Sequence, residues 1–141
     1  MGSRRYSRVR LCAADFRTYD HLSFRAAQIP RHPHTLSSIG DLKFKVELED
    51  GSGTTSAIKI QAYKGGIDDP YGRKHFNEPA ENDLGWAMEF ETIRIRLTDF
   101  THDAGAALNL SDISTVRFLF GGTAGPNKGA LAIDQVEVLN D

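Results

Sequence analysis

The stretch LKFKVELEDG, residues 42–51, decides the fold class of this chain. Its apolar residues recur at every second position, and charged residues fill the positions between them. The apolar set is Leu42, Phe44, Val46 and Leu48, and the charged set is Lys43, Lys45, Glu47 and Glu49. Because successive side chains of a β-strand point to opposite faces, this period of two predicts a strand with one face on a core and one in water.

A β-hairpin is predicted directly after this strand. The turn-forming residues DGSG at 50–53 separate it from a second alternating run at Ile58, Ile60 and Ala62. Five more segments alternate in the same way: residues around Val9 and Leu11, HLSFRAAQI at 21–29, TIRIRLTDF at 92–100, TVRFLF at 115–120 and LAIDQVEV at 131–138. Seven strands with no long 3.6-residue period predict an all-β antiparallel sandwich or barrel. The one helical candidate is a turn or two at residues 110–113.

The composition is that of one ordinary soluble domain, with 40% hydrophobic and 26% charged residues over 141 positions. A chain of this length buries roughly two thirds of its surface on folding, so we expect a single domain over residues 1–141. The net charge of −2 argues against a nucleic-acid partner, and the basic start RRYSRVR is typical of a strand at a sheet edge. No apolar run approaches the roughly 20 residues that a membrane span needs.

Two features concern the origin of the chain. A single cysteine, Cys12, excludes an intrachain disulfide, so cysteine pairing says nothing about the compartment. Residues 1–3, MGS, look like a vector-derived start that should be left out of fold reasoning. We therefore expect the domain to have been excised from a larger protein.

One long connection, residues 64–86, interrupts the series of short turns. Loops longer than about 15 residues are uncommon in compact domains and usually have a function or lack order. This one carries four aromatic or imidazole side chains among acids and glycines: Tyr71, His75, Phe76 and Trp86. It is the first place where the sequence predicts a binding surface.

The last predicted strand contains a break in its own pattern. Leu131 and Ile133 share one face, whereas Val136 belongs to the opposite phase, and the slip falls at Asp134-Gln135. One extra residue in a strand is a β-bulge, which lets both apolar sets point inward and re-aims the side chain at the defect. Asp134 is then directed at backbone amides or at a cation, since burying a bare carboxylate would cost several kcal/mol.

With these segments in place the chain resembles a known group. It is similar to the galactose-binding-like β-jelly rolls, in particular the carbohydrate-binding-module type appended to secreted bacterial hydrolases. The resemblance covers most of the chain and rests on these pieces: Asp15-Phe16, Tyr19 to Gln28, Met88, Thr92 to Phe100, Leu110 to Phe120 and Leu131 to Val138. These motifs are degenerate apolar patterns with a few polar positions, so they indicate the fold well and the ligand poorly.

The resemblance also implies a structural calcium ion. In that group the aspartate after the apolar pair of the closing strand often helps to hold calcium, and Asp134 matches that position. Its implied partners lie near the N-terminal part, where Asp15 and Asp20 occur, although a preceding strand that commonly supplies ligands is short or missing here. The alternative is an Asp134 carboxylate that hydrogen-bonds a neighbouring strand or loop without a metal.

Modules of this type bind glycans by stacking aromatic rings on sugar faces. In this sequence most rings fall at inward positions, and charged residues occupy the outward ones: Lys43, Lys45, Glu47, Glu49, Lys59, Arg94, Arg96 and Arg117. A flat crystalline polysaccharide is therefore disfavoured as a ligand. We expect a glycan to meet Tyr71 and Trp86 of the long loop, with Tyr63 at a strand end, although Trp86 would equally serve to close the edge of the sandwich.

The sequence does not predict an enzyme. It contains no G-x-S-x-G elbow, and Cys12 lies in an apolar segment where a packed thiol is expected. Acids suited to glycoside hydrolysis are present, but they gather in the long loop with no enclosing pocket implied: Asp68, Asp69, Glu78, Glu81 and Asp83.

Two functions follow as expectations. The first, which the resemblance implies, is a non-catalytic carbohydrate-binding accessory module, joined to the catalytic domain of a larger extracellular or cell-envelope enzyme. The second is a structural or protein-interaction domain of the same fold with no small-molecule ligand. One fold hosts many functions, so the fold alone does not decide between them.

Overall fold

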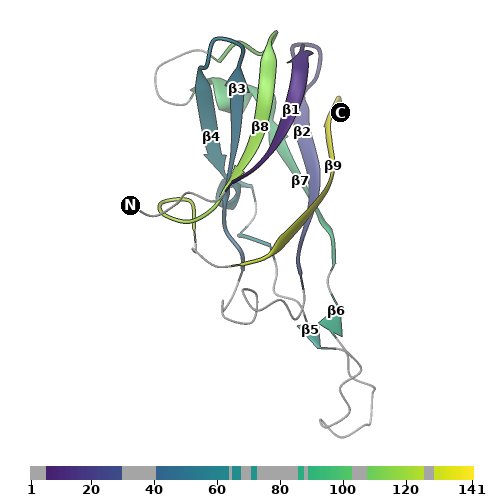
Figure 1. Cartoon of the computed structure of the whole chain (residues 1–141). Coiled ribbons are helices and arrows are strands. Elements are labelled where there is room, and N and C mark those ends of the chain that lie inside the picture. The colour runs from purple at the N-terminus through teal and green to yellow at the C-terminus, as the bar shows by residue number, and fades with distance from the viewer. Residues whose placement is uncertain are drawn as a thin grey trace, which may run out of the picture.

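The protein is a sandwich of two antiparallel sheets, seen in a computed structural model that describes residues 6–29, 41–63, 65–67, 71–72, 86–87, 89–102, 108–125 and 129–141 (Figure 1). The four-stranded sheet has the order β1-β8-β3-β4, with β1 at Tyr6–Ala14, β8 at Ile113–Leu119, β3 at Lys45–Asp50 and β4 at Thr55–Lys59. The three-stranded sheet has the order β7-β2-β9, with β7 at Glu91–Arg96, β2 at His21–Gln28 and β9 at Leu131–Leu139. The predicted antiparallel sandwich and its seven strands are confirmed.

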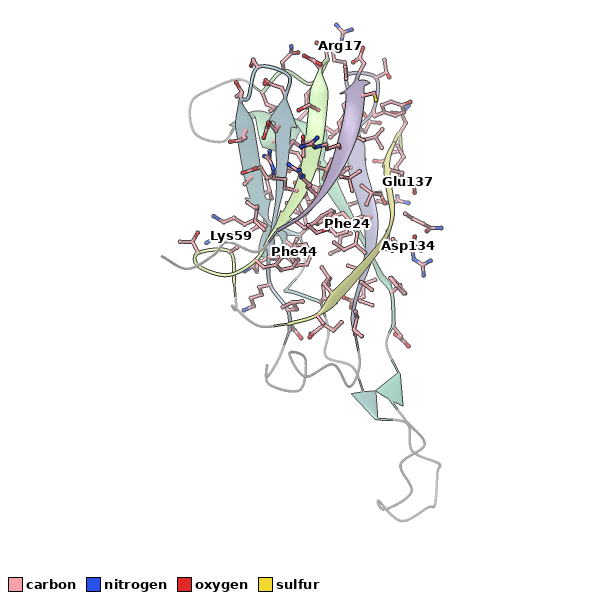
Figure 2. All side chains as sticks on the ribbon, viewed as in Figure 1. Arg17, Phe24, Phe44, Lys59, Asp134 and Glu137 are labelled. Atoms are coloured by element: carbon pink, nitrogen blue, oxygen red, sulfur yellow. The ribbon has the colours of Figure 1, made fainter. Side chains whose placement is uncertain are left out.

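The core lies between the two sheets and is built around phenylalanine. Phe24 of β2 is fully buried, and the centroid of its ring lies 5.2 Å from that of Phe118 on β8 and 6.2 Å from that of Phe44, just before β3. The Phe24 and Phe118 rings meet edge to face, which is a favoured geometry for aromatic pairs. Figure 2 shows Phe24 and Phe44 between the sheets, so the alternation of residues 42–48 directs its apolar face inward as predicted.

The predicted hairpin is confirmed, but its first strand begins later and its second strand ends earlier than the sequence suggests. β3 pairs with β4 from Lys45↔Lys59 to Glu49↔Thr55, and a short 3-10 helix, η1, follows at Ile60–Ala62. A second 3-10 helix, η2, occupies Leu97–His102, where the sequence predicted a continuing strand. Residues three apart share one face of a 3-10 helix, so Leu97 and Phe100 are both buried there.

Two further sequence predictions are wrong. Residues 110–113 form a turn that leads into β8 rather than a helix, because the Asn109 side chain accepts hydrogen bonds from the backbone and hydroxyl of Ser111. Cys12 is exposed rather than packed. Leu11 packs against the core, so Cys12, the next residue of β1, points to the opposite face. The position of β1 at a sheet edge agrees with the basic start of the chain.

The predicted bulge in β9 is confirmed at the predicted place. Arg25 of β2 pairs with Asp134 and Ser23 pairs with Glu137, so two residues of β9 lie opposite Phe24 alone. Gln135 absorbs the extra length at φ 48°, in the left-handed region. Leu131, Ile133, Val136 and Val138 consequently all pack on the core, whereas Asp134 and Glu137 lie on the exposed side of β9 (Figure 2).

Replacing Gln135 with Gly should raise the free energy of unfolding by about 0.5–1 kcal/mol. A left-handed conformation costs a non-glycine residue roughly 1–2 kcal/mol, and part of this gain is offset by the greater freedom of glycine in the unfolded chain. Chemical denaturation measures the change, with Gln135→Ala as the control that keeps the backbone strain. A Gly variant no more stable than the Ala variant would contradict the strained bulge.

The charged outward residues divide between two surfaces. Those of β3, β4 and β8 lie on the outside of the four-stranded sheet, and Arg94 and Arg96 lie on the outside of β7 in the other sheet. Arg117 donates to Glu47 at 2.8 Å and is ion-paired with Glu49. Burial lowers the pKa of Arg117, but its hydrogen bonds to the two carboxylates outweigh burial and raise that pKa.

Within the described ranges, no helix has the length and apolar character that crossing a membrane requires.

Candidate functional site

A pocket of about 410 Å³ opens where the edges of the two sheets meet. β4 ends the four-stranded sheet and β7 ends the three-stranded sheet, and the 3-10 helix that follows each strand adds residues to the wall. The lining consists of His21, Ile58, Ala62, Tyr63, Arg94, Arg96 and Asp99. The pocket therefore joins one aromatic ring and two small apolar patches to a set of charged and polar groups.

Strand alternation explains the basic side of the pocket. Ile93 and Ile95 of β7 are buried, so Arg94 and Arg96, which alternate with them, face outward. His21 begins β2 directly opposite Arg96, and residues opposite one another in an antiparallel pair share a face.

The two 3-10 helices provide the aromatic side of the pocket. Tyr63 follows η1, and its backbone N–H donates to the carbonyl of Ile60, which ties the residue to the end of that helix. The Tyr63 hydroxyl donates a hydrogen bond to Oδ2 of Asp99, in the first turn of η2. Asp99 thus holds the tyrosine ring across the gap between the two sheet edges.

The nitrogen donors of this pocket have few hydrogen-bond acceptors among the described residues. Nδ1 of His21 is buried and has no hydrogen-bond partner in the described part of the chain. Its nearest acid is Asp141, at 3.6 Å, and Arg94 approaches the same carboxylate oxygen at 3.9 Å. Both distances exceed those of hydrogen bonds, and the Asp141 side chain is 69% exposed, so these contacts are weak.

Of the three residues predicted to meet a glycan, the structure places Tyr63 in the pocket. The backbones of Tyr71 and Trp86 belong to a two-stranded ribbon, β5 at Tyr71–Gly72 and β6 at Trp86–Ala87, in which Gly72 pairs with Trp86. Figure 1 shows this ribbon at one end of the sandwich, apart from both sheets. The Tyr71 and Trp86 side chains and most of the long loop, including its acids, lie outside the described residues, so their role stays a prediction.

The structure does not bring the three carboxylates predicted for calcium together. Oδ1 of Asp134 accepts a hydrogen bond from the backbone N–H of Gln135. The Asp20 backbone bonds Leu139, five residues farther along β9 and so roughly 15 Å from Asp134.

The third carboxylate, Asp15, is ion-paired with Arg17 at 2.7 Å. The hydrogen bonds from Arg17 lower the pKa of Asp15 to about 2. No group of three or more His, Cys, Asp or Glu side chains that could hold a metal occurs among the residues that the structure describes. The described residues do not fit calcium, whose six to eight oxygen ligands must converge, and the metal stays a prediction.

One buried carboxylate was missed by sequence reasoning. Asp50 closes β3 and is 2% exposed, and its two oxygens accept hydrogen bonds from Ser52, Thr54 and Asn109. Because the donors that surround it are N–H and O–H groups, this carboxylate fastens loops and is not presented to a cation. The signal for it was the turn sequence DGSGT, in which an aspartate characteristically bonds the backbone two residues on.

No protein-family model matches the sequence, and no curated protein matches it. Among solved structures the chain is similar to a family 11 carbohydrate-binding module from Clostridium thermocellum, solved in complex with a β-1,3-1,4-mixed-linked tetrasaccharide. The two share 13% sequence identity at a TM-score of 0.54, over 96% of this chain and 67% of that chain. At this identity the likeness concerns the fold alone, and it confirms the β-jelly-roll sandwich that the resemblance implied.

Proposed function

We propose that this domain binds carbohydrate without transforming it, and that the pocket around Tyr63 is the binding site. The observation that carries the proposal is the pairing of Tyr63 with Asp99. A hydrogen bond fixes the ring in an open pocket whose other walls are apolar on one side and polar on the other.

The lining suits the mixed surface of a sugar. The face of a pyranose ring presents C–H groups, which pack on an aromatic ring such as Tyr63 and on small apolar groups such as Ile58 and Ala62. Its hydroxyls need hydrogen-bonding partners at the rim, and Arg94, Arg96 and His21 supply nitrogen atoms there. The likeness in fold to a sugar-binding module supports the same proposal.

The non-catalytic part of the proposal is supported by the acids in the pocket. Glycoside hydrolysis uses two carboxyl groups flanking the scissile bond, and within the described lining Asp99 is the one carboxylate. That carboxylate already accepts the Tyr63 hydroxyl. We further propose that the domain serves as an accessory module of a larger secreted or envelope enzyme, with Tyr71 and Trp86 extending the sugar contact.

Replacing Tyr63 with Ala should weaken glycan binding at least tenfold, because the stacking ring is lost, while Tyr63→Phe should weaken it by about threefold, because the ring stays but its anchor on Asp99 is lost. Binding is screened on a glycan array that includes the β-1,3-1,4-mixed-linked tetrasaccharide, and the tightest ligand is measured by titration calorimetry.

The matched control is Tyr19→Ala, since Tyr19 is a tyrosine that is 39% exposed and does not line the pocket. Tyr63→Phe should keep the wild-type melting temperature within about 3 °C, and Tyr63→Ala, which removes a half-buried ring packed on the core, should lower it by about 5 °C and still fold. If the wild type binds no glycan, the alternative of a structural or protein-interaction domain is correct. If Tyr63→Ala binds like the wild type, the glycan site lies elsewhere.

A further inference from the structure

The pocket has more hydrogen-bond donors than acceptors. Arg96 carries a guanidinium with five N–H donors, and it has no partner in the part of the chain that the structure describes. Arg94 is 56% exposed and reaches an acid only at 3.9 Å. The buried Nδ1 of His21 is also without a hydrogen-bond partner among the described residues.

Few hydrogen-bond acceptors of the described pocket lining are available to a ligand. Asp99 is the one carboxylate in the described lining, and one of its oxygens already accepts the Tyr63 hydroxyl. Neutral sugars offer hydroxyls, which donate as well as accept, so a site for neutral sugars usually sets carboxylates and amides beside its cations. A group that only accepts would match this pocket better.

We propose that the ligand of this pocket is an acidic glycan, and that Arg96 with Arg94 binds the carboxylate of a uronic acid residue. The inference rests on the proposed carbohydrate-binding function and names its ligand class. A guanidinium presents parallel N–H donors that match the two oxygens of a carboxylate, so Arg96 can bind it in bidentate fashion.

The neighbouring groups complete the arrangement. Tyr63 stacks on the ring of the uronic acid and thereby sets the direction in which its carboxylate points. Asp141 leaves Arg94 free to turn toward the ligand, because its contacts with Arg94 and His21 are long and exposed and are readily exchanged for a tighter pair. The two arginines lie two positions apart on one face of β7, roughly 7 Å at the backbone, so both can approach a single sugar unit.

The experiment compares acidic oligosaccharides with neutral partners of the same backbone. The probes are tetragalacturonate with its full methyl ester, and glucuronic-acid-substituted xylotetraose with plain xylotetraose, measured by titration calorimetry at low salt on the whole chain. We expect at least one acidic chain to bind ten times or more tightly than its neutral partner. Arg96→Gln should reduce that ratio to about one, and Arg8→Gln should leave it unchanged, because Arg8 is an exposed arginine on the other sheet.

Each other result overturns the proposal in a distinguishable way. Equal binding of acidic and neutral chains, or binding of the mixed-linked tetrasaccharide alone, would refute the acidic ligand and leave the proposed function intact. Failure of every glycan to bind would refute both proposals together. An acid preference that survives in Arg96→Gln would show that this pocket is not its source.

Discussion

Replacing Phe24 with Ala should lower the free energy of unfolding by about 3–5 kcal/mol, the largest effect that we expect from any single substitution in this chain. The Phe24 side chain is fully buried in the middle of β2 and packs against rings from the facing sheet, with Phe118 at 5.2 Å and Phe44 at 6.2 Å between ring centroids. Alanine removes the apolar area and leaves a cavity that the rigid sheets around it fill only in part.

Phe24 also lies opposite the bulge of β9, where two residues face one. The cavity would therefore open at the irregular point of the β2–β9 pairing. Urea denaturation followed by tryptophan fluorescence or circular dichroism measures the change. Val9→Ala is the control, because Val9 faces the same core from the sheet edge but is 37% exposed and should cost under about 1 kcal/mol. A loss at Phe24 as small as that at Val9 would show that this cluster does not dominate the core.

Replacing Asp50 with Ala should lower the melting temperature by about 10 °C, since several donors from two loops lose the one buried carboxylate that they share as acceptor. Oδ1 of Asp50 accepts from the backbone of Ser52 and of Thr54 at 3.0 Å each, and Oδ2 accepts from the backbone of Asn109 at 3.0 Å. The side chain therefore joins the β3–β4 turn to the segment that precedes β8. Asp50→Asn keeps one acceptor oxygen and should lose about half as much.

The effect of Asp50 should depend on pH in a stated direction. The hydrogen bond from the Asn109 backbone, with that from the Ser52 hydroxyl, lowers the pKa of Asp50 below its ordinary value of 3.8. A lowered pKa in the folded state contributes stability above the unfolded-state pKa, and that contribution is lost as the pH falls through the folded-state value. The gap in melting temperature between wild type and Asp50→Asn should thus be full at pH 6 and shrink below about pH 4.

Thermal melts from pH 6 to pH 3 test this pair of expectations. The control is Asp15→Ala, whose carboxylate also has a lowered pKa but lies in an exposed pair with Arg17, so its removal should change the melting temperature by no more than about 2 °C. A gap for Asp50→Asn that stays the same at pH 3 and pH 6 would contradict an ionised, hydrogen-bonded Asp50.

Much of this fold could be predicted because its signals are local. The alternation of residues 42–48 identifies one strand without reference to any other part of the chain. The slip at Asp134-Gln135 identifies the bulge, because the apolar residues on either side of it must reach the same core. The 3-10 helix at Leu97–His102 was not predicted, because the alternation that precedes it continues up to Leu97. The signal against a strand was the spacing of three residues between Leu97 and Phe100, which are both buried.

The pocket escaped prediction for a different reason. Its walls come from β2, from the end of β4 with η1, and from β7 with η2, and these are distant in the sequence. The spacing of residues in the sequence does not predict the hydrogen bond between Tyr63 and Asp99, because that contact depends on the strand orders of the two sheets. The sequence predicted Tyr63 as a glycan contact from its place at a strand end, and it predicted only that Arg94 and Arg96 face outward, without assigning them to a site. Their assembly into one site required the structure.

The bulge also fixes how the closing strand can change in length. Two residues of β9 lie opposite one residue of β2. This single extra residue keeps the apolar side chains on both sides of the bulge directed at the core. Losing Asp134 or Gln135 would place Ile133 and Val136 two positions apart, so the strand would regain regular alternation without the bulge and its apolar residues would still face the core. The turns between strands can vary by any number of residues, whereas an odd change in β9 away from the bulge turns one part of the strand away from the core, so the length of this strand behaves like a reading frame.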